Sequence, residues 1–255
     1  MTTNKDKKLK RLLDSHTPET VLLASWLEKN GISYDLQQYY LRSGWLESLG
    51  VGAFMRPHEN VRWEGAMYSL QVQAQLPVHV GGMTSLSLQG LAHYVRIGSE
   101  TIYIYSPLYT KLPKWFLARD WGSPLKHVKT SLLPKDFGFF NAKVMNVRIR
   151  MSSPERAILE CLHLAPDHLD MVECYQVLEN LSNLRPKLLQ ELLEHCTSIK
   201  VKRLFLFLAE KSKHQWFSFL DLSKISTGTG ERSIVKGGTF NKKYKITIPK
   251  ELAEQ

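Results

Sequence analysis

The side chains best suited to chemistry lie in one short polar segment, residues 33–42, whose sequence is SYDLQQYYLR. Glutamine amides pair with adenine edges and arginine pairs with guanine or phosphate, so this composition is typical of a helix that reads duplex DNA. If Leu36 and Tyr40 face the core, an amphipathic helix here turns its other side chains outward. We therefore expect DNA contacts from Ser33, Tyr34, Gln37, Gln38 and Arg42.

A glycine-rich turn follows this segment and joins two short apolar runs. The runs are WLESL (45–49) and AFM (53–55), and residues 50–52 between them read Gly-Val-Gly. Two short extended runs on either side of such a turn predict a β-hairpin. Because glycine is small, we expect Gly50 and Gly52 to let the turn approach a DNA backbone.

Helical patterns before this segment complete a known order of elements. Leucines spaced among Lys and Arg predict an amphipathic helix over 6–15, and Thr17 followed by Pro18 predicts the start of a second helix. That helix should stop at Gly31. Two helices, a tight turn, a third helix and a hairpin form a winged helix-turn-helix, which we expect to occupy residues 1–60.

The remainder of the chain, residues 61–255, mixes helical and strand patterns, so the predicted fold class is α+β with a larger C-terminal domain. Ser152 and Glu155 have the spacing of a capping box, and Glu155 with Arg156 predicts an ion pair at the same helix start. Helical patterns cover 63–76, 152–162, 167–181 and 186–197, and strand patterns cover 101–107, 144–151 and 243–249.

The charge of +10 is unevenly distributed. Residues 1–61 hold 8 Lys or Arg and 7 Asp or Glu, whereas residues 200–250 hold 12 and 3. A basic face attracts phosphate-rich or acidic partners, although a solvated loop would have the same composition. The candidate residues lie among glycines that would let backbone N–H groups approach an anion, and they are Arg232, Lys236, Lys242, Lys243 and Lys245.

Several functional classes lack support in the sequence. The nine histidines are scattered without an HExxH pattern, and no GxSxG or P-loop spacing occurs, so we predict no catalytic residues, no metal and no cofactor. No apolar run reaches the length of a membrane helix, and the charged start is unlike a secretory signal. Three cysteines without CxxC spacing are typical of free thiols in a reducing cytoplasm.

The segment TPETVLLASWLEKNGISYDLQQYYLRSGWLESLGVGAFMRP resembles the N-terminal winged helix of the AbiEi family. The likeness continues through VHVGGMTSLSLQGLAHY, MSSPERAILECL and GERSIVKGGTFNKKYKITIP, and so covers nearly the whole chain in the expected order. The chain departs from the expected pattern at Gln37, Gln38 and Tyr39, where a recognition helix would naturally be basic.

The resemblance implies an antitoxin and transcriptional regulator of a type IV toxin–antitoxin (abortive infection) system. Such a protein would repress its own operon by binding upstream inverted repeats. It would also counter a nucleotidyltransferase-like toxin without forming a stable complex. The alternative is a protein that does not bind DNA and uses its basic face to bind the toxin or the toxin's RNA or protein target.

Overall fold

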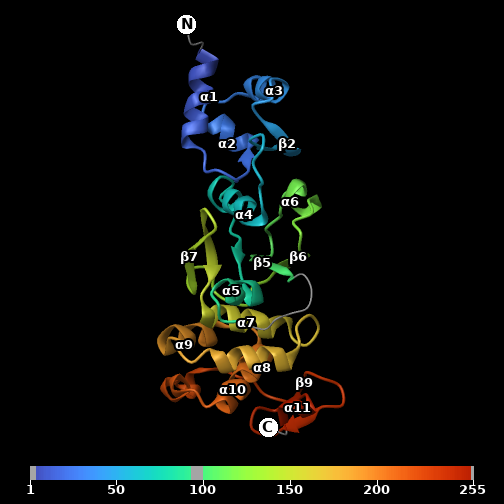
Figure 1. Ribbon diagram of the computed structural model, residues 1–255. Helices are drawn as coiled ribbons and strands as arrows, with labels where there is room; N and C mark the ends of the chain where they lie inside the picture. The colour runs from blue at the N-terminus through green and yellow to red at the C-terminus, as the bar shows by residue number, and fades with distance from the viewer. Residues whose placement is uncertain (1–3, 93–99, 254–255) are drawn as a thin grey trace. The chain divides into compact units, whose positions relative to one another are not determined.

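The computed structural model describes residues 4–92 and 100–253, and their fold is mixed α and β, as predicted (Figure 1). The chain forms two compact units, and it passes from one to the other several times. Unit 1 comprises Met1–His79, Tyr109–Leu125 and Asn141–Arg150, and unit 2 comprises Val80–Leu108, Lys126–Phe140 and Met151–Gln255.

Unit 1 begins with three helices and a small antiparallel sheet of order β1-β3-β2. Its core gathers the apolar faces of all three helices around Leu22, Leu46 and Phe54. The elements in chain order are α1 (Asn4–Ser15), β1 (Leu22–Leu23), α2 (Ala24–Lys29), α3 (Tyr34–Arg42), β2 (Glu47–Gly50), β3 (Ala53–Met55) and α4 (Trp63–Val72).

The predicted start of the second helix at Thr17 and Pro18 is wrong. Glu19 has a positive φ of 59°, which a helix cannot accommodate, and the helix starts only at Ala24. The intervening Leu22 and Leu23 pair with Phe54 and Ala53 of the hairpin, which buries both leucines. The predicted hairpin is confirmed, and β1 adds a third strand to it.

Helix α4 packs directly against the chain that leads into β1. Ser69 Oγ and Gln73 Nε2 both donate to the carbonyl of Val21, at 2.7 and 2.6 Å. Gln73 Oε1 accepts from the Leu23 amide at 2.9 Å. Gly65 permits this approach, since a Cβ there would lie 2.0 Å from the Glu19 carbonyl oxygen. The domain boundary predicted at residue 60 lies within compact unit 1, whose first segment runs to His79.

Two later segments also belong to unit 1. The first contains the short helix α6 (Lys114–Ala118), which packs against β2. The second, 141–150, is tied to α4 by Gln71, whose amide nitrogen donates to the carbonyls of Val78 and Arg150 at 3.1 Å each. Gln71 Oε1 in turn accepts from the Arg150 amide at 2.8 Å.

A five-stranded sheet has the order β6-β5-β4-β8-β7, in which β4 and β8 are parallel. Several of its strands include residues from both units, because the chain passes between units within them. The strands are β4 (His79–Val80), β5 (Ile102–Ser106), β6 (Leu125–Lys129), β7 (Phe139–Val144) and β8 (Val147–Ser152).

Stacked helices form the main core of unit 2, where α7 packs against α5, α8, α9 and α10 (Figure 1). A three-stranded sheet of order β10-β11-β9 follows near the C-terminus. These elements are α5 (Gly82–Leu88), α7 (Pro154–Leu164), α8 (Met171–Asn180), α9 (Pro186–His195), α10 (Ile199–Ser212), the 3₁₀ helices η1 (Gln215–Phe219) and η2 (Leu222–Lys224), β9 (Arg232–Ser233), β10 (Thr239–Asn241), β11 (Ile246–Ile248) and α11 (Lys250–Ala253). Across residues 4–92 and 100–253, none of the helices combines the length and apolarity needed to cross a lipid bilayer.

The predicted capping box and ion pair at the start of α7 are wrong. Ser153 is the N-cap and makes no side-chain capping bond. The carboxylate of Glu155 instead accepts from the backbone amide, Nε and Nη2 of Arg185, at 2.9, 3.0 and 3.0 Å. Burial alone raises the pKa of Glu155, but these hydrogen bonds outweigh burial and hold it below 4.5.

Arg156 pairs with Glu160 one helical turn later, Nε to Oε1 at 2.8 Å, and both side chains are buried. Oε2 of Glu160 accepts from the Gly82 amide at 2.9 Å and from Ser152 Oγ at 2.8 Å. Gly81 makes room for this carboxylate, since a Cβ there would lie 2.3 Å from Oε2. One buried charge thus joins the start of α5, the end of β8 and the middle of α7.

We predict that Glu160→Gln destabilises the protein by about 3–5 kcal/mol, because it leaves the buried Arg156 guanidinium without its counter-charge. The shift of the urea midpoint at unchanged m-value measures this. The exposed Glu191→Gln is the matched control and should change stability by about 0.5 kcal/mol or less. Equal midpoints for the two variants would contradict the role given to Glu160.

Candidate nucleic-acid interface

Helix α3 buries one side and presents the other to solvent, as its sequence predicts. Leu36 and Tyr40 lie in the core of unit 1, whereas the side chain of Tyr34 is 64% exposed. Arg42 is also exposed, and its Nε donates to the Gln38 carbonyl at 3.3 Å. The half-buried Gln38 lies one turn from each of them, so these three side chains form a row along the outward side.

Ser33 precedes this row as the N-cap of α3. Its backbone is extended, its residue is exposed, and its hydroxyl makes no capping hydrogen bond within the helix. The first turn of a helix presents backbone amides without helical partners, and a phosphate oxygen binds well at such a position.

The expectation that Gln37 faces outward is wrong, because its side chain is fully buried. Its amide nitrogen donates to the Ala24 carbonyl at 3.2 Å and to the Ile32 carbonyl at 3.0 Å. Gln37 thereby links the first residue of α2 and the turn before α3. It fixes the angle between the two helices rather than offering its amide to a base.

The hairpin ends in a tip where Val51 is 98% exposed. Gly52 is also exposed, with a φ of +74°, and its carbonyl accepts from the Ala24 amide at 3.0 Å. Gly50 differs from the expected open position, since a Cβ there would lie 2.8 Å from Cβ of Trp115. Val51 and Gly52 therefore form the free tip, and Gly50 lies against α6.

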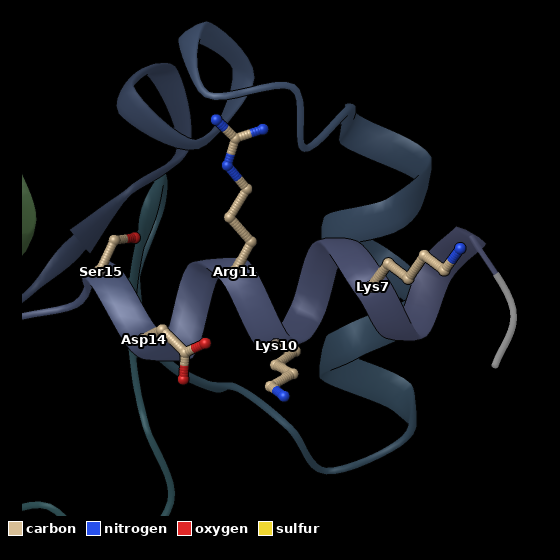
Figure 2. A pocket seen from close by; sticks show the side chains of 5 residues that line it. All are labelled: Lys7, Lys10, Arg11, Asp14 and Ser15. Carbon is tan, nitrogen blue, oxygen red and sulfur yellow. The ribbon is translucent and has the colours of Figure 1, made fainter.

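Helix α1 adds basic side chains that were not among the residues predicted from the sequence, although its KDKKLKR run was a visible signal. A shallow hollow of about 410 Å³ lies on this helix. Figure 2 shows Arg11 and Lys10 projecting to opposite sides of the helix. Its lining residues are Lys7, Lys10, Arg11, Asp14 and Ser15. A second hollow of about 390 Å³ lies between α1 and the turn at Gly31, whose carbonyl accepts from Lys8 Nζ at 2.9 Å.

His16 connects the end of α1 to the segment after the hairpin. Its Nε2 lies 3.2 Å from Oε2 of Glu59, which also accepts from the Glu19 amide at 3.0 Å. Burial lowers the pKa of His16 below 6.5, and this effect exceeds the opposing influence of Glu59. The histidine is therefore held neutral in the folded protein at neutral pH.

The five predicted residues of the basic C-terminal face are all exposed, and they lie on and beside the β10-β11-β9 sheet. Lys243 is already paired, since its Nζ binds Oε1 of Glu210. Tyr244 donates to Oε2 of the same carboxylate at 3.0 Å, and burial together with this bond raises the pKa of Tyr244. Arg232, Lys236, Lys242 and Lys245 remain the outward cations of this face.

Arg203 organises the glycine-rich loop below that face, and sequence reasoning missed it. The residue is 2% exposed, and its guanidinium donates to four backbone carbonyls. These belong to Thr227, Gly228, Gly230 and Lys245, at 2.8, 3.0, 2.7 and 3.1 Å. The loop therefore turns carbonyls inward to a buried cation.

In the described part of the chain, no cluster of His, Cys, Asp and Glu is suited to hold a metal ion.

Two protein-family models match the chain, one over its N-terminal part and one over its C-terminal part. Residues 99–249 match the family described as "Transcriptional regulator, AbiEi antitoxin, Type IV TA system", and residues 5–97 match its N-terminal domain. Among solved structures, the chain is similar to the RV2827C protein from Mycobacterium tuberculosis, at 13% identity and a TM-score of 0.60. That similarity covers 96% of this chain and 92% of the other, and at such low identity it concerns the fold alone. No curated protein sequence matches significantly.

We predict that Gln37→Ala lowers stability by about 1–3 kcal/mol, because it removes two hydrogen bonds that hold α2 and α3 together. Gln38→Ala, one residue on, should change stability by about 0.5 kcal/mol or less. Denaturant titrations of the two variants measure this. A neutral Gln37→Ala would contradict its structural assignment.

We predict that His16 makes unit 1 sensitive to mild acid. Because the folded state holds His16 neutral, the unfolded state binds its proton first as the pH falls below 6.5, and stability is lost from there down to the lower folded pKa. Between about pH 7.5 and about 5.5, wild type should lose on the order of 1 kcal/mol more than His16→Gln. Thermal melts at both pH values measure the difference, and parallel losses would refute it.

Proposed function

Because the chain belongs to the AbiEi antitoxin family of type IV toxin–antitoxin regulators, we propose that it represses its own operon by binding upstream inverted repeats through a winged helix-turn-helix. A transcriptional regulator of this family binds DNA, and an antitoxin acts against a cognate toxin. The family is one of antitoxins and regulators, not of enzymes.

The order α1-β1-α2-α3-β2-β3 supports the winged helix, since the second and third helices are joined by a tight turn at Gly31 and followed by a hairpin. The observation that carries the proposal is the outward row of α3. Tyr34, Gln38 and Arg42 there combine an aromatic ring, an amide and a guanidinium, and the hairpin tip at Val51 is exposed as well.

In this proposal α3 enters the major groove, where Gln38 and Arg42 read base edges and Ser33 holds a phosphate at the helix start. Val51 and Gly52 approach the backbone or minor groove as the wing. Gln37 contributes by fixing the helix pair. Residues 1–60 form the reading module, and α4 supports it through Val21 and Leu23.

The antitoxin activity is assigned to the C-terminal domain, residues 61–255. Its cognate toxin would be nucleotidyltransferase-like, countered without a stable complex. The outward cations Arg232, Lys236, Lys242 and Lys245 would contact an acidic or phosphate-bearing target, since 12 basic and 3 acidic residues occur between positions 200 and 250.

A second candidate is an interaction protein that does not bind DNA, and the near-neutral charge of residues 1–61 favours it. The salt dependence of binding distinguishes a DNA-binding repressor from such an interaction protein. The affinity of a protein that contacts several phosphates falls steeply as the salt concentration rises, which gives log K a steep slope against log salt. A protein complex built on the winged helix would lack that slope and any preference for one DNA sequence.

We predict that the full chain shifts the duplex directly upstream of its gene in preference to shuffled competitor. Arg42→Ala should weaken this binding by about 1–3 kcal/mol, because it removes a base or phosphate contact. Gel shifts at several salt concentrations measure both effects. Lys187→Ala, an exposed change in unit 2, is the control and should bind like wild type. Equal binding to both duplexes by wild type would refute the repressor proposal.

A further inference from the structure

The positive charge of unit 1 comes mainly from segments that lie far from the winged helix in sequence. Residues 1–61 hold 8 basic and 7 acidic residues, whereas 109–125 hold three Lys or Arg against one Asp. Both segments belong to the same compact unit. A duplex carries a dense row of phosphates, so a nearly neutral reader gains affinity from cations placed beside it.

Helix α6 lies against the wing strand. It packs against β2, and Gly50 at the end of that strand faces Trp115, with room for no side chain between them. Gly50 adopts a φ of +145°, which glycine tolerates and other residues rarely do. The wing strand is thus seated on α6 by a contact that requires glycine.

Aromatic residues of α6 and of the segment after it pack against one another. Trp115 and Phe116 are buried and meet edge to face, with ring centroids 5.6 Å apart. Trp121 packs on Phe116 at 5.4 Å, and its indole nitrogen donates to the Phe116 carbonyl at 2.8 Å. These contacts hold residues 115–121 together, and β2 packs against the helix within this segment.

Two exposed lysines flank the start of this helix, Lys111 before Pro113 and Lys114 after it. Among the ion pairs formed by the described residues, none uses either lysine. Both lysines therefore belong to the segment whose Trp115 meets the wing strand at Gly50. Figure 1 shows α3, β2 and α6 on one side of unit 1.

We propose that α6 is a second part of the DNA-binding surface: it positions the wing through Trp115 and Gly50, and Lys111 and Lys114 bind a backbone phosphate next to the wing. The proposal rests on the repressor function given above. Trp115 and Gly50 are positioning residues, whereas the two lysines touch the ligand. The ligand is the phosphodiester backbone of duplex DNA, bound without regard to base sequence.

The first test replaces one charge at a time in the full chain. Lys114→Ala should weaken binding to the upstream duplex several-fold and reduce the slope of log K against log salt by about 0.9, the value for one neutralised phosphate. Lys187→Ala removes the same charge from unit 2 and should leave the slope unchanged. Both substitutions are on the surface, so thermal melts should show both proteins folded.

The second test separates positioning from simple charge. A Cβ at Gly50 would lie 2.8 Å from Trp115 Cβ, whereas one at Gly52 meets only Ala24 Cβ at 4.0 Å, and both glycines have positive φ. Gly50→Ala should therefore lift the wing from α6, and Gly52→Ala should not. The effect of Lys114→Ala should shrink in the Gly50→Ala background and persist in the Gly52→Ala background.

The outcomes distinguish the two claims. If wild type does not select its upstream duplex, the repressor function and this inference both fail. If wild type selects it but Lys114→Ala keeps the slope of Lys187→Ala, only the inference about α6 is overturned. If Lys114→Ala lowers the slope equally in both glycine backgrounds, the lysine contact stands and the positioning role of Gly50 is refuted.

Discussion

A buried charge is costly unless hydrogen bonds and an opposite charge compensate it, and this constraint shapes unit 2 at Glu160. Its carboxylate binds the Arg156 guanidinium, the Gly82 amide and the Ser152 hydroxyl. Removing any partner would leave charge or polarity uncompensated in a dry core. The Gly81–Gly82 turn and the Ser152–Glu160 stretch, distant in sequence, are therefore held in one arrangement. Arg203 obeys the same rule with four carbonyls, and so it shapes the basic loop.

In unit 1 uncharged polar side chains join elements that are distant in sequence. Other side chains on the surface are therefore left for binding. The side-chain amide of Gln37 donates hydrogen bonds to two backbone carbonyls, which sets the angle between α2 and α3. Gln73 and Ser69 tie α4 to the entry of β1. These bonds are made by inward-facing side chains, so the outward row of α3 and the tip at Val51 are not needed to hold the helices together. These exposed groups are the ones from which DNA recognition is proposed.

Local patterns in the sequence predicted what depends on neighbours along the chain. The amphipathic face of α3, the hairpin after it and the α+β class follow from spacing and glycine placement. The errors occurred where a distant partner decides the outcome. Leu22 and Leu23 form a strand because they pair with the hairpin strand that contains Phe54. Glu155 forms its ion pair with Arg185 and not with the adjacent Arg156. Periodicity placed Gln37 outside, yet two carbonyls hold it inside, and no local signal assigned α6 to unit 1.

The central claim is that one surface of unit 1 contacts DNA, and hydrogen–deuterium exchange of the full chain with and without its upstream duplex tests it most directly. The account predicts added protection in α3, in residues 47–52 and around α6, with little change in α9. Protection confined to residues 224–249 would contradict it and would identify the C-terminal basic face as the DNA-binding surface.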